Sequence, residues 1–345
     1  MIVGICGYGY TGSGAFFSLI REYENVIILP GNKDVEFVIP YTPDGIEDLK
    51  YHLCDNPVKG TGCDAAIYRF KLMCKDLKRS HDRFTNNQFY DITEKYLNSL
   101  IHVKWKAVRL FEYERQPGNF KMYKRLLISV VRNFLGKRGI KINGFPLVDR
   151  FFSFKPDGFV EKSKEYVMSI IGHHDDKIVL LNQPFAVNNP ESSMKYFEDP
   201  YCIIVDRDPR DLYVMLKHVY GTKGLFIPTD NVENFIIYYR RLRQSEIVHD
   251  SSRIIRIQFE DLIYKYDETV NRIEHFLKNK LGKHVNRMEL FKPEVSVKNT
   301  CIYNRFEEDR DDIKRIEAEL AHWLYNFDHI GTINISNNLN EFTYL

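Results

Sequence analysis

Several patterns that would assign this 345-residue sequence to a common class are missing from it. No run of 18 apolar residues occurs, so the sequence does not predict a membrane-spanning helix. The six cysteines have no Cys-x-x-Cys spacing, which disfavours a zinc site and predicts reduced thiols. Lys and Arg total 49 against 47 for Asp and Glu, and a net charge of +2 gives no nucleic-acid signature. Without a recognisable leader pattern, we expect a cytoplasmic location.

The order of predicted elements indicates an α/β fold with a mostly parallel sheet, in which ligands bind beyond the carboxyl ends of the strands. The segment 54–172 has apolar residues at helical spacing and is predicted to be a mainly helical insertion, an acceptor lid, within a single domain spanning 1–345. Strands are predicted at Ile2–Cys6, Val26–Leu29, Ile178–Leu181, Cys202–Val205 and Ile254–Gln258. Helices are predicted at Gly45–Leu53, Asp211–His218, Asn231–His249, Tyr266–Leu281 and Asp309–Tyr325.

A glycine-rich turn follows the first predicted strand and leads into a helix, with the sequence Gly7-Tyr-Gly9-Tyr-Thr-Gly12-Ser-Gly14. Glycines let backbone amides point inward at an anion, and a helix amino terminus adds the positive end of its dipole. Ser13 is predicted to stand at the N-cap position, where its hydroxyl can serve the helix or a phosphate oxygen. A phosphate-bearing ligand is therefore the first hypothesis.

Two familiar phosphate loops fit this turn poorly. Gly7-x-Gly9-x-x-Gly12 matches the dinucleotide fingerprint, but no acidic residue closes the second predicted strand, and Asp34 arrives late. A nucleoside triphosphatase or kinase loop needs Gly-Lys-Ser/Thr, and no lysine occurs before Lys33. An NAD(P)-dependent oxidoreductase stays open as an alternative.

A second candidate anion site follows the strand at Cys202–Val205. The chain there reads Asp206-Arg207-Asp208-Pro209-Arg210-Asp211, and Pro209 suits the first turn of a helix. A guanidinium at the carboxyl end of a strand, beside a helix amino terminus, is well placed for a phosphate. The alternative is that both arginines pair with the neighbouring acids on a surface turn.

These segments together resemble the sulfotransferases that use 3′-phosphoadenosine 5′-phosphosulfate (PAPS). Arg-Asp-Pro-Arg-Asp after an apolar strand resembles that family's 3′-phosphate-binding segment, and Arg253–Leu277 resembles its strand, Glu-Asp-Leu and helix. More closely, the chain is similar to bacterial sulfotransferase-like proteins of surface-glycan pathways. The resemblance implies a P-loop nucleotide-binding sandwich and transfer of a sulfuryl group from PAPS, without a metal, to a hydroxyl of a carbohydrate or lipid-linked glycan acceptor.

The resemblance also implies roles for individual residues. Arg207 would bind the 3′-phosphate, and a loop with Lys298, Asn299 and Thr300 would close over the nucleotide. Two positions depart from the family pattern, because Tyr10 replaces a cation and Met215 replaces a serine. Lys33, Lys217 or His218 could compensate. The residues that would wrap the 5′-phosphate are Gly9, Tyr10, Thr11, Gly12, Ser13, Gly14 and Ala15.

Transfer to a hydroxyl also requires a general base. The segment Gly31–Phe37 follows the second predicted strand and carries two carboxylates, Asp34 and Glu36. By resemblance to bacterial and Golgi-type relatives, Glu36 is the predicted base. A catalytically degenerate relative that binds nucleotide without turnover stays open as a further alternative.

The sequence from Pro117 to Val148 contains no Asp or Glu. This basic segment suits an anionic glycan, a lipid-linked diphosphate sugar or an anionic membrane surface. A solvated helix face is the simpler alternative, and nucleic acid is not expected. Its seven cations are Lys121, Lys124, Arg125, Arg132, Lys137, Arg138 and Lys141.

Overall fold

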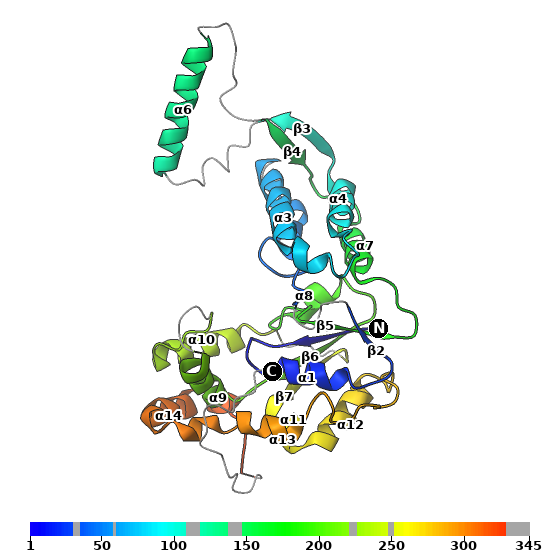
Figure 1. Cartoon of the computed structure of the whole chain (residues 1–345), viewed down its shortest axis with the longest axis vertical. Helices are drawn as coiled ribbons and strands as arrows, with labels where there is room; N and C mark the ends of the chain where they lie inside the picture. Colours follow the sequence, from blue (N-terminus) through cyan, green and yellow to red (C-terminus); the bar gives the residue numbers. More distant parts are fainter. Residues whose placement is uncertain are drawn as a thin grey trace. The chain divides into compact units, whose positions relative to one another are not determined.

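The computed structural model describes residues 1–29, 35–57, 60–107, 118–136, 147–220, 226–247 and 252–328 (Figure 1). The chain divides into two compact units. The first contains residues 1–41, 83–85 and 167–345, and the second contains residues 42–82 and 86–166. None of the helices in the described ranges is both long enough and apolar enough to span a bilayer.

The first unit is built on a parallel sheet of five strands, which confirms the predicted α/β class. The strand order is β2-β5-β1-β6-β7, so the first strand occupies the centre. Ile2 of β1 pairs with Val179 of β5 on one side and with Pro200 of β6 on the other. The strands are β1 (Ile2–Cys6), β2 (Val26–Ile28), β5 (Ile178–Asn182), β6 (Pro200–Asp206) and β7 (Ile254–Gln258).

Helices cover this sheet, as the continuous apolar sequence of its central strands requires. Every residue of β1 is buried, which is typical of a parallel strand packed on both faces. Phe16 and Leu262 belong to one core cluster with β1, β5, β6 and β7. The helices that contribute to this cluster are α1 (Ser13–Ile20), α11 (Phe259–Tyr264) and α12 (Tyr266–Phe276) (Figure 1).

A second apolar cluster joins three further helices of the first unit. Tyr213, Phe235 and Ile316 are fully buried in it, together with Ile302 and Phe306 from the segment before the last helix. Its helices are α9 (Pro209–Val214), which continues as a π-helical turn over Met215–Tyr220, α10 (Val232–Gln244) and α14 (Arg310–Glu319). The remaining short helices of this unit are α8 (Pro190–Met194) and α13 (Pro293–Ser296), and α7 (Phe159–Ile171) contains the unit boundary.

The second unit is mainly helical but also contains a β-hairpin that the sequence analysis did not predict. The hairpin strands β3 (Val103–Ala107) and β4 (Val148–Phe152) pair antiparallel. Asp64, fully buried, accepts the Phe151 amide and pairs with Arg150, so it ties β4 to a helix. The other elements are α2 (Ile46–Lys50), a π-helical turn at Tyr51–Asp55, α3 (Gly60–His81), α4 (Phe89–Leu100) and α6 (Gly118–Gly136).

Element types were predicted more accurately than element ends. The helix expected at Asn231–His249 ends at Gln244, and the one expected at Tyr266–Leu281 ends at Phe276. The closing helix expected at Asp309–Tyr325 is α14 followed by a short 3₁₀ turn. All six cysteines are free thiols, as predicted.

Candidate functional site

The glycine-rich loop lies at the carboxyl end of β1, the central strand of the sheet. Gly9, Tyr10 and Gly12 have φ angles of 91°, 58° and 88°. A Cβ at Gly9 would lie 2.5 Å from the Phe226 ring, and a Cβ at Gly12 would lie 2.4 Å from the Phe259 ring. Glycine is therefore required at both positions by the backbone conformation and by the close approach of a ring.

The loop enters α1 differently from the prediction. Ser13 is the first residue of the helix, and Gly12 is the N-cap, with no side-chain hydrogen bond. The prediction that Ser13 caps the helix is therefore wrong. A glycine N-cap brings no side-chain oxygen to the first turn, although its carbonyl accepts the Ala15 amide at 3.0 Å. The residues at the positive end of α1, Gly12, Ser13 and Gly14, are small, which suits an anion.

One polar side chain, Gln183, holds the start of this loop. Gln183, which has a φ of 51°, accepts the Gly7 amide through its Oε1 atom at 3.0 Å. The Gln183 amide donates to the Ile5 carbonyl, and its carbonyl accepts the Tyr41 hydroxyl at 2.9 Å. Thr11 is 3% exposed, and its hydroxyl has no hydrogen-bond partner among the described residues. Sequence reasoning gave Gln183 no role, because its contacts depend on the β1–β5 pairing.

Arg207 connects the glycine loop to the segment after α13. Its Nη1 atom donates to the Tyr10 carbonyl at 3.2 Å, and its Nη2 atom donates to the Asn299 carbonyl. The guanidinium also lies 5.2 Å from the centre of the Phe259 ring and 3.0 Å from the Met215 sulfur. Three segments that the sequence analysis singled out separately therefore meet at one buried side chain, which is 5% exposed.

Asp211 anchors the same segment from the other side. Its carboxylate accepts the Cys301 amide at 2.8 Å and the Tyr303 amide at 3.2 Å. Thr300 is 1% exposed, and its hydroxyl donates to the Val297 carbonyl at 2.7 Å. Lys298 is half-buried. Of the three residues predicted to form a closing loop, Asn299 and Thr300 are thus fixed in the protein interior.

Lys217 and His218, which were suggested as compensating cations, are both paired with acidic residues. Both bind the buried carboxylate of Asp309, and Lys217 also contacts Asp312 at 3.1 Å. The Tyr10 ring itself stacks on Phe226, with ring centres 5.9 Å apart. The third suggested cation, Lys33, lies outside the described residues, as does Asp34.

Near Arg207 lies a cluster of three fully buried carboxylates, those of Asp208, Asp211 and Glu260. Glu260 accepts the Asp208 amide at 2.9 Å, while Asp208 binds Arg210 with Oδ2 to Nη2 at 2.7 Å. Burial raises the pKa of Glu260 to about 8 and the pKa of Asp211 to about 7, and the negative charge of Asp208 adds to both shifts. The Glu260 Oε2 atom has no hydrogen-bond partner among the described residues, which suits a protonated carboxyl.

The raised pKa of Glu260 predicts a pH dependence of stability. Between its ordinary value of 4.5 and about 8, the folded chain binds a proton here that the unfolded chain has lost. This group therefore lowers the free energy of unfolding as pH rises, by about 1 kcal/mol per pH unit within that window. In Glu260→Gln, which keeps an acceptor for the Asp208 amide, the part of the slope due to Glu260 should disappear, while Asp211 still contributes a slope of the same sign between about pH 3.8 and 7. Urea unfolding at several pH values measures it, and an unchanged slope would show that Glu260 is ionised throughout.

Glu36 follows the undescribed residues 30–34 and lies close to the start of the glycine loop. The Phe37 amide donates to the carbonyl of Asn182 at 2.8 Å, which attaches this segment to the end of β5. Glu36 is exposed, but desolvation by the surrounding protein still raises the pKa of its carboxyl. Its charge also contributes to the raised pKa of Tyr41, whose hydroxyl binds Gln183. Glu36 thus interacts electrostatically with Tyr41, and Tyr41 donates to Gln183, which accepts the Gly7 amide.

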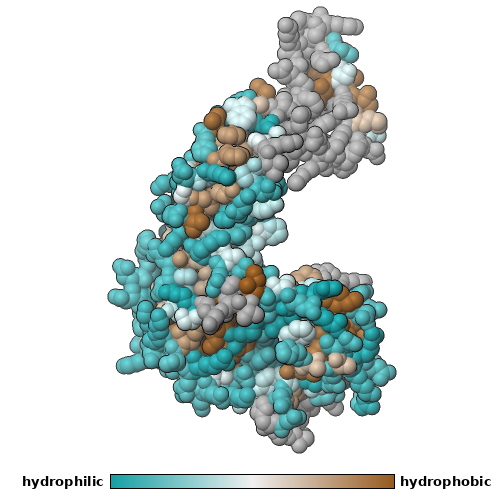
Figure 2. Space-filling model, turned by 180° about the vertical axis from the view of Figure 1, so that it is seen from behind, coloured by the Kyte–Doolittle hydropathy of each residue, from teal (hydrophilic) through white to brown (hydrophobic). Residues whose placement is uncertain are grey.

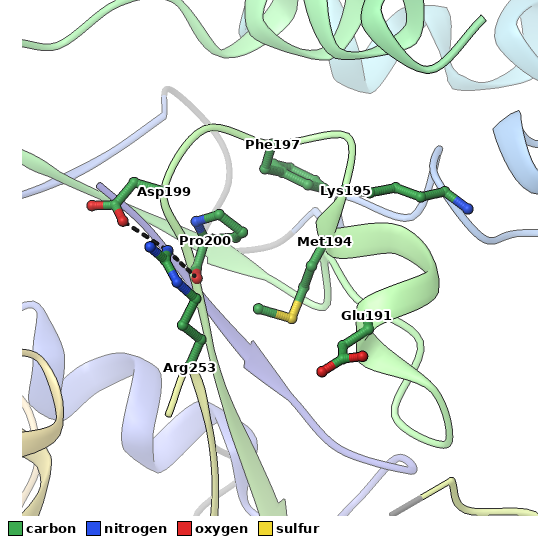
Figure 3. A pocket seen from close by; sticks show the side chains of 7 residues that line it. All are labelled: Glu191, Met194, Lys195, Phe197, Asp199, Pro200 and Arg253. Carbon is green, nitrogen blue, oxygen red and sulfur yellow. Dashed lines mark hydrogen bonds and ion pairs between the residues drawn. The ribbon is translucent and has the colours of Figure 1, made fainter. Parts of the chain in front are cut away.

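The cavity drawn in Figure 3 lies at the opposite edge of the sheet. Asp199 and Pro200 stand at the amino end of β6, where Asp199 pairs with Arg253 at 2.7 Å. The volume of this cavity is about 470 Å³. In open parallel sheets ligands bind beyond the carboxyl ends of the strands, so this cavity is not the candidate site. Its lining residues are Glu191, Met194, Lys195, Phe197, Asp199, Pro200 and Arg253.

Another cavity, of about 530 Å³, lies at the carboxyl ends of β6 and β7. The Tyr8 hydroxyl donates to Glu246, one of its lining residues, at 2.9 Å. Arg243 and Arg256 line this cavity as well, and each is paired with Asp206 at 2.6–2.7 Å. Its arginine charges are matched by carboxylates, so the glycine loop is the stronger candidate for an anion.

The structure thus brings the glycine loop, Arg207 and Asn299 together and attaches Glu36 nearby. No family model matches this chain, and comparisons with curated proteins and with solved structures find no match either. The case for a function therefore depends on the residues and their geometry.

Proposed function

We propose that this protein is a sulfotransferase that moves a sulfuryl group from PAPS to a hydroxyl of a carbohydrate or glycan precursor. The observation that carries the proposal is the position of Arg207. This residue of the Arg-Asp-Pro-Arg-Asp segment binds the backbone of the glycine loop at Tyr10 and of the predicted closing loop at Asn299. Three segments implied by the family resemblance are neighbours at the carboxyl edge of a parallel sheet.

The glycine loop fits the 5′-phosphate end of such a nucleotide. Its left-handed residues Gly9, Tyr10 and Gly12 lead into the amino terminus of α1, and Gly12 adds no side chain there. The fit at the 3′-phosphate is conditional, because Arg207 already donates to two carbonyls. A phosphate would have to replace the Asn299 carbonyl as an acceptor, so nucleotide binding requires the segment around Asn299 to shift.

The reaction assigns one task to the base and another to the loop. The acceptor oxygen bonds to sulfur while the bond from sulfur to the 5′-phosphate oxygen breaks, and the leaving phosphate keeps the electron pair. Glu36 takes the proton of the acceptor hydroxyl, and desolvation raises its pKa and so its basicity. The glycine loop stabilises the leaving phosphate. Tyr10 supplies no cation for this, so helix dipole and backbone amides carry the stabilisation.

The oxidoreductase alternative is weakened by the strand order. In the dinucleotide-binding order 3-2-1-4-5-6, the second strand lies beside the first. Here β5 lies between β1 and β2.

The degenerate, non-catalytic alternative is supported by Tyr10 and Met215. However, the Met215 sulfur contacts Arg207 at 3.0 Å, so the position where the family has a serine still faces the arginine. The free thiols support a cytoplasmic location for the enzyme.

Calorimetric titration of the full chain separates these functions. The proposal predicts that 3′-phosphoadenosine 5′-phosphate binds at least about tenfold more tightly than adenosine 5′-phosphate, because a second phosphate gains a charge-assisted contact. NADH and ATP are the matched competitors. Equal affinity for the two adenosine phosphates would remove the 3′-phosphate site, and tight binding of NADH alone would favour the oxidoreductase. Binding of the bisphosphate without turnover of PAPS would favour the degenerate relative.

A further inference from the structure

Helix α6 (Gly118–Gly136), in the second unit, carries a continuous set of exposed apolar side chains. The exposed fractions are 55% for Leu126, 65% for Leu127 and 64% for Val130. Met122 and Tyr123 are 53% and 66% exposed. At 100° per residue these five positions fall within about 140° of the helix circumference. The helix thus presents an apolar face, and brown atoms of this segment are visible at the upper right of Figure 2.

The sequence places basic residues on the other side of this helix. Positions Lys121, Arg125 and Arg132 fall within about 40° of one another on the circumference, roughly opposite the apolar face. The segment from Pro117 to Val148 carries seven cations and no carboxylate. A helix with an apolar face, a cationic face and no acidic residue has the pattern of one that lies in a membrane interface.

We infer that α6 binds the surface of an anionic lipid bilayer, with its apolar face in the interface and its cations at the headgroups. A bilayer supplies both the hydrocarbon that the apolar face requires and the negative charge that the basic residues require. An acidic glycan supplies only the charge. A second copy of the chain could cover the apolar face, but its α6 segment has seven further cations and no carboxylate, so it does not supply the negative charge. This inference does not depend on the proposed sulfotransferase activity.

Co-sedimentation of the full chain with lipid vesicles tests the inference. We expect binding to vesicles of phosphatidylcholine and phosphatidylglycerol in equal amounts, and at least about tenfold weaker binding to phosphatidylcholine alone. Added salt should weaken the binding to the anionic vesicles, because it screens exposed charges. Equal binding to both kinds of vesicle, or no binding to either, would overturn the inference.

Paired variants test the two faces separately. Lys124→Gln with Arg125→Gln should weaken binding to anionic vesicles by about thirtyfold, since each cation near such a surface contributes about fivefold. Lys75→Gln with Arg79→Gln removes the same charge from exposed positions of α3, in the same unit, and should leave binding unchanged. If both double variants lost the same vesicle affinity, the effect would be due to the net charge of the chain, and a specific role of α6 would be overturned.

The apolar face is tested by Leu126→Gln with Val130→Gln, which changes only exposed side chains. We expect about tenfold weaker vesicle binding. A tryptophan placed on this face in Leu127→Trp reports on its surroundings. Addition of anionic vesicles should shift its emission to shorter wavelength by more than the same vesicles shift the emission of the unmodified chain. The unmodified chain could instead self-associate without binding vesicles. If the Leu126→Gln, Val130→Gln variant abolished that self-association, the apolar face would be assigned to a second copy of the chain. Binding of an acidic polysaccharide but not of vesicles would assign it to a glycan.

Discussion

Glu36→Gln is expected to lower turnover of PAPS by roughly 10²–10⁴-fold, the usual contribution of positioned proton transfer, while leaving nucleotide affinity unchanged. Glutamine keeps the size of the side chain but cannot accept the acceptor's proton. The measurement is release of 3′-phosphoadenosine 5′-phosphate from PAPS in the presence of carbohydrate acceptors. Because the base acts only when ionised, the rate of the unmodified enzyme should rise with pH through the raised pKa of Glu36. The variant should lose that rise.

Glu198→Gln is the matched control for this experiment. Glu198 is also an exposed glutamate of the first unit, and it lies before the amino end of β6, at the edge away from the glycine loop. Its replacement should leave turnover unchanged. Asp34→Asn tests the neighbouring carboxylate of the same sequence segment. A strong loss in Asp34→Asn with full activity in Glu36→Gln would transfer the role of base, and full activity in both would exclude this segment from the chemistry.

Arg207→Ala is expected to weaken binding of 3′-phosphoadenosine 5′-phosphate by about 2–4 kcal/mol, because it removes a charge-assisted contact to a phosphate. From the sequence alone, near-normal folding would be expected of this variant, if Arg207 faces a cleft. The structure changes that expectation. Arg207 is 5% exposed and binds the Tyr10 and Asn299 carbonyls, so its loss should also lower the free energy of unfolding, by about 1–3 kcal/mol.

The two effects are distinguished by measuring both affinity and stability. Arg207→Lys keeps the charge but cannot reach two carbonyls as a planar fork does, so it should recover part of the affinity and little of the stability. Arg253→Ala removes an arginine whose side chain is 41% exposed and pairs with Asp199 at the other edge of the sheet. It should change neither quantity appreciably. Normal nucleotide affinity in Arg207→Ala would exclude this residue from the phosphate site.

Much of the first unit could be predicted from local sequence. β1 and β7 were predicted with the ends that they have, because each is a short apolar run bounded by turn or helix signals. Pro209 was expected to suit a first helical turn, and α9 begins there, two residues before the predicted start at Asp211, with Asp208 capping it through the Arg210 amide. Residues 103–107 and 148–152 gave no comparable signal. They form a hairpin whose strands are 40 residues apart. Residues 103–107 alternate apolar and polar, but this strand is largely exposed and its partner shows no such alternation, so local sequence did not indicate the pairing.

The sequence by itself determined the chemistry available to the site: a glycine-rich loop before a helix, an arginine after a buried strand, and a carboxylate at Glu36. These are local patterns, because loop curvature, helix ends and residue types are properties of a few neighbouring positions. Only the tertiary structure decided their contacts. Arg207 meets Tyr10 and Asn299 across 197 and 92 residues of chain, and Gln183 meets Gly7 across 176. Such contacts follow from strand order and from burial of the intervening core, which no short segment encodes.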